Sequence, residues 1–253
     1  MMKKYFFVLG LLVSTTPLMA NVSIDTVPAK NYKNVVRFNI SNPIIFGFGN
    51  NFIFGYERVV SPHQSFSVNI GWQRIASDYS SPSNDSISMN HNKTASGFNF
   101  GVDYRFYLAK ENKYEAPHGL YIGPYYSYNA YSNENNWNYN MSNGSVSTVK
   151  TNADFTINTV GAELGYQFVL WKRMTLDFVL IGPGISSYKL DATISGNLTD
   201  AQKDKLREAL KNYFSQKFPG MDYVFSGQSL SANGTLNTTS IGFRYLIHIG
   251  FRF

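Results

Sequence analysis

Residues 241–253 have the sequence IGFRYLIHIGFRF, in which large apolar side chains occupy every second position. The odd-numbered residues from Ile241 to Phe253 are all apolar or aromatic, whereas the even-numbered ones include Arg244, His248 and Arg252. Successive side chains of a β-strand point to opposite faces, so this alternation predicts a strand with one apolar face and one polar face.

The same alternation recurs along the chain, for example in residues 97–108 (GFNFGVDYRFYL) and 159–170 (TVGAELGYQFVL). A stretch of this kind is a strand signal wherever it lasts longer than a few residues. The segments that carry it number eight in our division of the chain: Val35–Phe46, Asn51–Val60, Ser65–Tyr79, Thr94–Leu108, Gly119–Asn133, Ala153–Leu170, Met174–Ala192 and Asn233–Phe253.

The connections between these segments alternate between short and long. The short ones are Ser61–Gln64, Ala109–His118 and Trp171–Arg173, and the long ones, rich in Ser and Asn, are Ser80–Lys93, Glu134–Asn152 and Thr193–Ala232. Only the first connection near Gly47–Asn50, which is short, departs from the pattern. Short turns at one end and long loops at the other, with an even number of strands, are typical of transmembrane β-barrels. We therefore predict an all-β fold, an eight-stranded antiparallel barrel with both termini at the short-turn, periplasmic end.

A soluble β-sandwich is the alternative, because its strands alternate too. The predicted strands are longer than the usual five or six residues. Their polar faces mix charges with glycine, which would weaken a strand that faces water but makes room for long side chains inside a narrow barrel. Composition agrees with a barrel, since only 15% of residues are charged and 16% are aromatic. Cysteine is absent, which excludes disulfides, zinc–thiolate sites and thiol nucleophiles.

The first twenty residues have the three parts of a secretory signal peptide: Lys3 and Lys4, an apolar run, and a segment that ends with a small residue, Ala20, at the cleavage position. The run is too short to cross a bilayer, so an N-terminal anchor helix is the weaker interpretation. We expect a signal peptide at 1–20, a short periplasmic segment at 21–34 and the barrel at 35–253. Nucleic acid is not an expected partner, because the basic residues are scattered and the chain is predicted to be exported.

Several glycine–aromatic strand motifs resemble small outer-membrane barrels of the OmpA/OmpX/OmpW kind, and more narrowly an uncharacterised family of such barrels from Bacteroidota. The motifs are Asn51–Arg58 (NFIFGYER), Gly101–Leu108 (GVDYRFYL), Gly119–Tyr126 (GLYIGPYY), Gly161–Leu170 (GAELGYQFVL) and Leu180–Gly184 (LIGPG). The resemblance implies a Gram-negative outer-membrane location, among lipid and lipopolysaccharide, and no known activity. It also implies that the terminal Phe253 is the signal read by the barrel assembly machinery.

Strand parity directs eight charged side chains into the barrel, four acidic and four basic. They are Arg37, Glu57, Asp103, Arg105, Glu163, Asp177, Arg244 and Arg252. Charges in a narrow lumen should pair, so equal numbers predict a closed ionic core and not an ion-selective pore. We expect Arg37 and Arg252 to share Glu57 and Asp177 in one network near the periplasmic end; the alternative is that each charge reaches water separately at the rim.

Two prolines, Pro124 and Pro183, fall inside predicted strands beside glycine. A closed barrel has no edge strand to accommodate proline, so we expect bulges or kinks there. The bulges could simply shape the barrel, or a kink could open a gap toward lipid.

The third long loop, residues 193–232, contains one predicted amphipathic helix near 200–218. Thr199 and Gln202 form a capping-box pattern, and Gly220 is a stop signal. The helix could cap the barrel, lie on the membrane or bind a partner.

Catalytic chemistry finds little support in the sequence. His63 and His118 fall in turns, His91 falls in a loop, and His248 near Arg244 and Glu163 is more often a core histidine than a catalytic one. No nucleophile, base and orienting group converge, and no metal or cofactor motif appears. We therefore expect no enzyme, cofactor or metal, but a scaffold or surface-loop interaction protein with a plugged lumen. A narrow channel or a carrier of small hydrophobic compounds is the first alternative, and an outer-leaflet lipid-modifying enzyme is the second.

Overall fold

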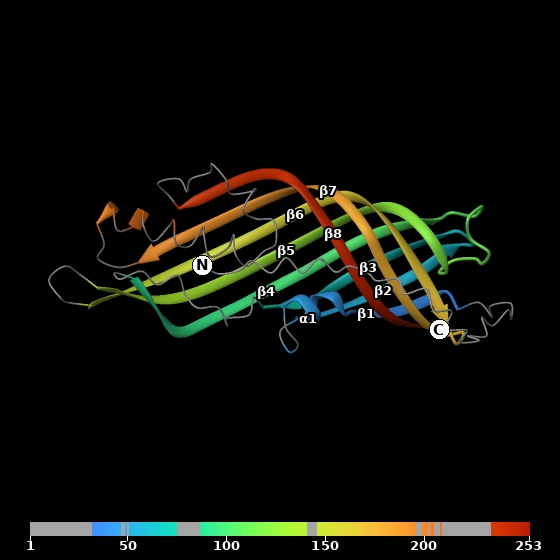
Figure 1. Ribbon diagram of the computed structural model, residues 1–253, viewed down its shortest axis with the longest axis horizontal. Helices are drawn as coiled ribbons and strands as arrows, with labels where there is room; N and C mark the ends of the chain where they lie inside the picture. The colour runs from blue at the N-terminus through green and yellow to red at the C-terminus, as the bar shows by residue number, and fades with distance from the viewer. Residues whose placement is uncertain are drawn as a thin grey trace, which may run out of the picture.

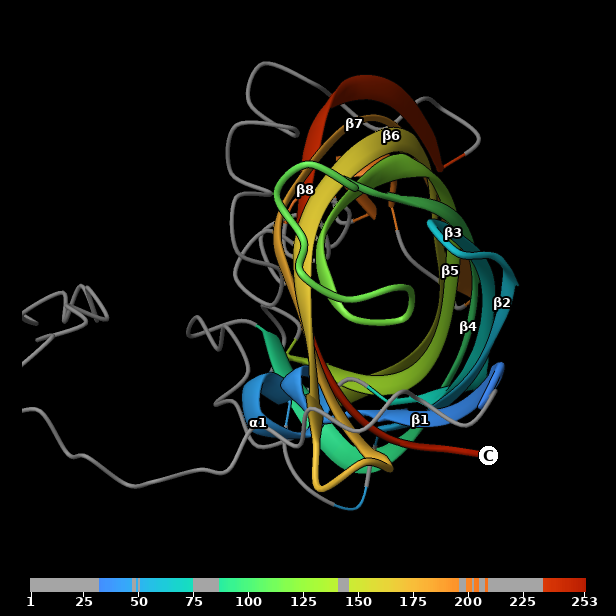
Figure 2. The same ribbon diagram turned by 90° about the vertical axis from the view of Figure 1, so that its right-hand side faces the viewer.

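The computed structural model describes residues 32–46, 49, 51–74, 87–140, 146–195, 199–201, 203, 204, 208 and 234–253. Eight antiparallel strands form a closed barrel in which each strand pairs with its neighbours in sequence (Figures 1 and 2). The elements are β1 (Asn34–Asn39), α1 (Ser41–Phe46), β2 (Asn51–Ser61), β3 (Gln64–Gln73), β4 (Ile87–Tyr107), β5 (Gly119–Asn140), β6 (Val146–Leu170), β7 (Met174–Ser195) and β8 (Thr235–Arg252). The predicted fold class is confirmed.

The barrel closes where the first strand meets the last. β1 pairs with β8 from Val35 opposite Arg252 to Asn39 opposite His248. Beyond these pairs, the backbone of Asn34 exchanges two hydrogen bonds with that of Phe253, at 3.1 and 2.9 Å. Figure 2 shows the resulting ring, with the C-terminus beside β1. Because β1 and β8 pair with each other, neither strand presents unpaired backbone groups along this seam.

The alternation seen in the sequence becomes the two faces of the barrel wall. In β2 and β3, buried and exposed residues alternate along nearly the whole strand. The outward face is strongly apolar, with exposed side chains that include Phe52, Phe54, Ile70, Trp72, Val160, Ile185, Ile241, Phe243 and Tyr245. The inward face carries most of the buried polar and charged residues, as expected when the lumen is lined by the polar positions of every strand.

The first strand is shorter than predicted. The prediction extended it to Phe46, but β1 ends at Asn39 and α1 follows. The Asn39 side chain accepts a hydrogen bond from the backbone N–H of Asn42 at 3.0 Å, which caps the start of α1. Pro43 has no N–H to donate to a neighbouring strand. The prediction was wrong here because local capping and proline outweigh the apolar alternation.

Two of the predicted long loops are in part strands. β5 and β6 continue through most of Glu134–Asn152 and pair from Glu134 opposite Asn152 to Asn140 opposite Val146. Lys150 and Glu134 add an ion pair of 2.6 Å across this hairpin. β4 likewise begins at Ile87, inside the predicted loop Ser80–Lys93. The β6 extension contains Val146, Thr148, Val149 and Thr151, whose residue types favour a strand, but it lacks the apolar alternation on which the prediction relied.

The three short connections lie at one end of the barrel, which we call the short-turn end; the opposite end is the long-loop end. Trp171 and Lys172 turn with positive φ angles of 47° and 67°. In the connection before β5, the Asn112 side chain both donates to and accepts from the backbone of Leu120, each at 2.7 Å. Both ends of the closed barrel, Asn34 and Phe253, also lie at the short-turn end (Figure 1).

The predicted signal peptide and almost all of the segment 21–34 lie outside the described residues. So does most of the predicted helix near 200–218, of which Asp200, Ala201, Lys203, Asp204 and Glu208 are described and helical. The backbone of Lys203 donates to that of Thr199 at 3.0 Å, as at the start of a helix. Within the described part of the chain, no helix has the length and apolar character needed to cross a membrane.

Candidate functional site in the barrel lumen

The eight charged residues expected inside the barrel all project from lumen-facing positions. Seven are buried, and Arg244 is partly buried. They come from β1, β2, β4, β6, β7 and β8, so strands on opposite sides of the barrel contribute to one interior. What the sequence could not specify is which acid meets which base.

Arg105 on β4 is the centre of the cluster. Its guanidinium contacts Asp103 through Nε at 2.7 Å, Asp177 through Nη2 at 2.9 Å and the amide oxygen of Gln167 through Nη1 at 2.9 Å. Glu57 lies 3.7 Å from the same guanidinium. The side chain is fully buried, so these partners replace the water that an exposed guanidinium would bind.

Arg37 on β1 binds the same two aspartates from the other side. It lies 3.2 Å from Asp103 and 3.3 Å from Asp177, and its Nε donates to Asn69 at 3.1 Å. Arg37 and Arg105 therefore share Asp103 and Asp177 in one four-residue network. Such a network satisfies buried charges more completely than isolated pairs would.

The expected network at the short-turn end is present only in part. Arg37 meets Asp177 as expected, and Glu57 joins the cluster through Arg105 and not through Arg37. Arg252 stays apart: its guanidinium lies over the ring of Tyr32 at 5.5 Å, and among the described residues no carboxylate is within ion-pair distance of it. Arg252 sits in the last pair of the β1–β8 ladder, where a cation can reach water at the rim.

A second ion pair lies closer to the long-loop end. Arg244 donates through Nε and Nη2 to Oε2 of Glu163, with the Nε contact at 2.9 Å. Its guanidinium also stacks over the ring of Tyr125 at 3.8 Å, and the Tyr125 hydroxyl donates to the carbonyl of Gly182 at 2.8 Å. His248 does not join this pair; its Nδ1 lies 3.2 Å from Asp177 instead. His248 is buried against Asp177, and the less favoured catalytic grouping with Arg244 and Glu163 is not the arrangement observed.

Sequence reasoning missed the neutral polar residues that complete the cluster. The Tyr107 hydroxyl lies 3.0 Å from Glu57 and 2.9 Å from Gln167, and the Tyr121 hydroxyl donates to Asp177 at 2.8 Å. Ser67 lies between Arg37 and Asp103 and hydrogen-bonds to both. The signal that could have found them is the same strand parity that selected the charges.

An aromatic layer lies above the charges, toward the long-loop end. Phe155 on β6 stacks between Tyr131 on β5 and Tyr188 on β7, with ring centroids 6.4 Å apart in both pairs. Leu190 and Leu236 are buried at the same end. The lumen is thus filled by two successive layers, one ionic and one apolar, which matches the capacity of an eight-stranded barrel to be filled by side chains.

Two of the remaining histidines lie in connections at the short-turn end. His118, in the connection before β5, packs edge-on against Tyr114 and Tyr166, and burial together with the nearby positive charge of Arg252 lowers its pKa. His63 lies in the turn between β2 and β3, and the side chain of His91 is outside the described set. Among the described residues no group of three His, Asp or Glu side chains could hold a metal ion.

Both prolines coincide with breaks in the strand ladders. The β4–β5 pairing skips Tyr104 and Arg105 opposite Gly123 and Pro124. The β6–β7 pairing skips Ala162 and Glu163 opposite Gly182 and Pro183.

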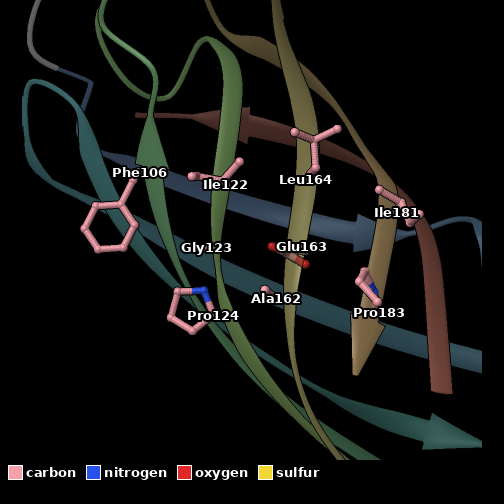
Figure 3. Close-up of a pocket in the computed structure, with 9 residues that line it drawn as sticks. All are labelled: Phe106, Ile122, Gly123, Pro124, Ala162, Glu163, Leu164, Ile181 and Pro183. Carbon is pink, nitrogen blue, oxygen red and sulfur yellow. The ribbon is translucent and has the colours of Figure 1, made fainter. Parts of the chain in front are cut away.

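The register of β7 also shifts by one residue, against both of its neighbours, just before Gly182. The predicted irregularity is therefore a β-bulge at Leu180–Ile181, followed by Gly182 and Pro183, which pair with β8 but not with β6. Between the two breaks, the outer wall holds a hollow of about 520 Å³ (Figure 3).

No protein-family model matches the sequence, and no curated protein is significantly similar to it. Among solved structures, the fold is similar to the crystal structure of CarO from Acinetobacter baumannii, with a TM-score of 0.39 and 12% identity over 88% of this chain and 97% of that one. A major outer membrane protein from Thermus thermophilus gives a TM-score of 0.36 and 8% identity over 87% of this chain and 98% of that one. Similarity at this level carries no inference about function, and the barrel architecture rests on the strand pairings themselves.

Proposed function

We propose that this chain is an integral outer-membrane protein whose barrel is sealed and which acts through its outer surface and its long-loop end. The observation that carries the proposal is the Arg37–Arg105–Asp103–Asp177 network, which joins β1, β4 and β7 across the lumen. An open pore would leave these side chains in water, whereas here they are buried and satisfy one another. The aromatic layer around Phe155 is a second obstruction.

The apolar outer face supports a membrane location. Large aliphatic and aromatic side chains are exposed around the wall, as on strands that face lipid. The exposed Trp171 at the short-turn end stands where the interfacial aromatic residues of such barrels stand. In this arrangement the short-turn end faces the periplasm, and Phe253 serves as the signal for the barrel assembly machinery. Outer-membrane lipid and lipopolysaccharide then surround the wall.

The absence of cysteine allows a direct test of location and orientation. Lys150→Cys places a single thiol on the β5–β6 hairpin at the long-loop end, and Lys172→Cys places one in the β6–β7 turn. Both variants are expressed in a Gram-negative host and treated with a membrane-impermeant maleimide. We expect Lys150→Cys to react in intact cells and Lys172→Cys to react only after the outer membrane is permeabilised. Reaction of both in intact cells, or of neither, would overturn the topology.

Conductance tests the sealed lumen. The refolded mature protein is placed in a planar lipid bilayer at high salt and several voltages, after its fold has been verified by gel mobility without heating. We expect no unit steps. Reproducible steps would mean that the charges line a water path, and the channel alternative would then replace the scaffold.

A further inference from the structure

We propose that Arg173 and Arg252, together with Tyr32, bind the phosphate group of an anionic phospholipid at the short-turn end of the barrel. The lipid would lie in the leaflet that meets this end of the wall, with its acyl chains against the outer face. The inference rests on the proposed function, because a phospholipid reaches these residues only if the barrel spans a membrane.

The two arginines lie opposite each other where the β7–β8 ladder ends. The last ladder pair is Met174 opposite Phe251, and one step further the backbone N–H of Arg252 donates to the carbonyl oxygen of Arg173 at 2.7 Å. Like charges directly opposite each other on neighbouring strands are destabilising. An anion bound by both side chains would replace this repulsion with two charge-assisted contacts.

One aromatic ring brings the two guanidinium groups to the same place. Tyr32 precedes β1, and the guanidinium carbons of Arg173 and Arg252 lie 4.9 and 5.5 Å from the centre of its ring. The Tyr32 hydroxyl accepts a hydrogen bond from Nη2 of Arg173 at 3.1 Å, and its own proton has no acceptor among the described residues. The three side chains therefore present hydrogen-bond donors and positive charge toward one another, a combination that suits an anion.

No acid of the described chain balances these charges. Among the described residues, no carboxylate lies within ion-pair distance of either guanidinium. The terminal carboxylate of Phe253 instead accepts hydrogen bonds from the backbone and side chain of Asn34, at 3.1 and 3.2 Å. Arg252 is only 6% exposed, and its Nε is buried without an acceptor. A buried charged donor without a partner is costly, and a bound anion would relieve that cost.

A ligand can reach both arginines from the rim. Arg173 is exposed. The Nη atoms of Arg252 have no hydrogen-bond partner among the described residues, yet only Nε of this guanidinium is closed off from solvent. The Nη atoms are therefore the part of Arg252 that an anion at the rim would meet.

The position of the cluster favours a lipid as the source of the anion. The guanidinium of Arg173 also lies 5.6 Å from the ring of Phe251, which points outward and is 44% exposed. Trp171, in the same turn, is 75% exposed. Hydrocarbon would thus lie directly beside the cations, and phosphate is the anion that a bilayer presents at this boundary. Arginine binds phosphate through two parallel hydrogen bonds, and two unmatched cations favour a head group with net negative charge.

The test measures which lipid lies next to Trp171. The mature protein, with Trp171 as its single tryptophan (Trp72→Phe/Trp137→Phe), is refolded into phosphatidylcholine vesicles that contain a minor fraction of phosphatidylglycerol. Bromine atoms high on the acyl chains of one lipid or the other quench a neighbouring tryptophan. At equal mole fractions of brominated lipid, we expect phosphatidylglycerol to be enriched about tenfold over phosphatidylcholine, as one charge-assisted hydrogen bond would produce.

Three variants in this background separate a site from general attraction. Arg173→Gln and Arg252→Gln should each remove most of the preference for phosphatidylglycerol. Neither should lower the urea midpoint in phosphatidylcholine alone, because each relieves the repulsion of a like-charged pair. Lys172→Gln is the matched control, since it removes the same charge from the adjacent position of the same turn, and it should keep most of the preference.

Equal losses in Lys172→Gln and Arg173→Gln, or no preference in the parent protein, would overturn the site. Inorganic phosphate is added in a parallel series, with sodium chloride at the same ionic strength as its control, and we expect the preference to survive both. Loss with phosphate alone would show that the site takes free phosphate and would overturn the lipid occupant. Failure of brominated phosphatidylcholine to quench Trp171 at all would instead overturn the membrane location on which the inference rests.

Discussion

Arg105 on β4 donates a hydrogen bond of 2.9 Å to Asp177 on β7, directly across the lumen of the barrel. The two strands are not neighbours in the sheet, so no ladder of backbone hydrogen bonds connects them. Asp177 also receives the Tyr121 hydroxyl at 2.8 Å and lies 3.3 Å from Arg37. One carboxylate thus ties β1, β4, β5 and β7 together, and the barrel interior is stabilised by contacts that the wall cannot make.

Replacing this carboxylate should therefore destabilise the whole barrel. Asp177→Asn leaves Arg37 and Arg105 buried with one anion fewer, and breaking a buried ion pair in this way costs about 3–5 kcal/mol. We expect a clear fall in the urea midpoint of unfolding, measured in detergent micelles by gel mobility without heating.

Asp191→Asn is the matched control on the same strand. Asp191 pairs with Lys189 at 2.7 Å, but both side chains are substantially exposed. Surface pairs contribute about 0–1 kcal/mol, so this substitution should shift the midpoint little. Equal shifts for the two variants would contradict the central role of Asp177.

Gly55 makes room for the arginine network. A Cβ at this position would lie 2.2 Å from Oδ1 of Asn69 and 2.8 Å from Cγ and Nε of Arg37. These two side chains are hydrogen-bonded to each other through Nε of Arg37 and Oδ1 of Asn69. Gly55→Ala should cost about 1–3 kcal/mol, the usual range for overpacking. Gly101→Ala should cost less, because its Cβ would approach no atom closer than 3.6 Å. Comparison of the two urea midpoints tests this, and a larger loss for Gly101→Ala would refute the account.

Phe155 is the middle ring of the aromatic layer, and its removal should leave a cavity between Tyr131 and Tyr188. We expect Phe155→Ala to lower the free energy of unfolding by about 3–5 kcal/mol, as for other buried aromatic residues. The ionic layer below remains, so planar-bilayer recordings should stay silent. Unit conductance in this variant would show that the aromatic layer alone seals the lumen.

The extent of the lipid-facing band can be tested with two valines of β6. Val160 and Val146 are 63% and 60% exposed, but Val160 lies within the barrel wall and Val146 lies near the tip of the β5–β6 hairpin. Arginine on the lipid face near the midplane costs about 2–4 kcal/mol and near zero outside the band. Insertion into vesicles should therefore fall for Val160→Arg and not for Val146→Arg, as measured by flotation. Unchanged insertion of both would argue against a membrane-spanning wall.

The parts of the site that could be predicted are those that depend on parity alone. Arg37, Glu57 and Asp177 project inward because every second residue of a strand does so, whatever the register. Their partners could not be predicted, since the strands of a barrel are tilted and staggered, and sequence numbers do not give the height of a residue in the lumen. This is why Arg252 lies apart from the network, although its ladder partner Val35 is only two residues from Arg37, which belongs to it.

The sequence by itself determined the class of fold, because alternation with period two and the turns between segments are local properties. It also determined which face of each strand is apolar and where Pro124 and Pro183 interrupt the β4–β5 and β6–β7 pairings. Only the tertiary structure decided that Arg105 is the centre of the charge cluster and that the outer wall is hollowed between Pro124 and Pro183. Each of these depends on which strands lie side by side and at what stagger, and that is set by closure of the whole barrel.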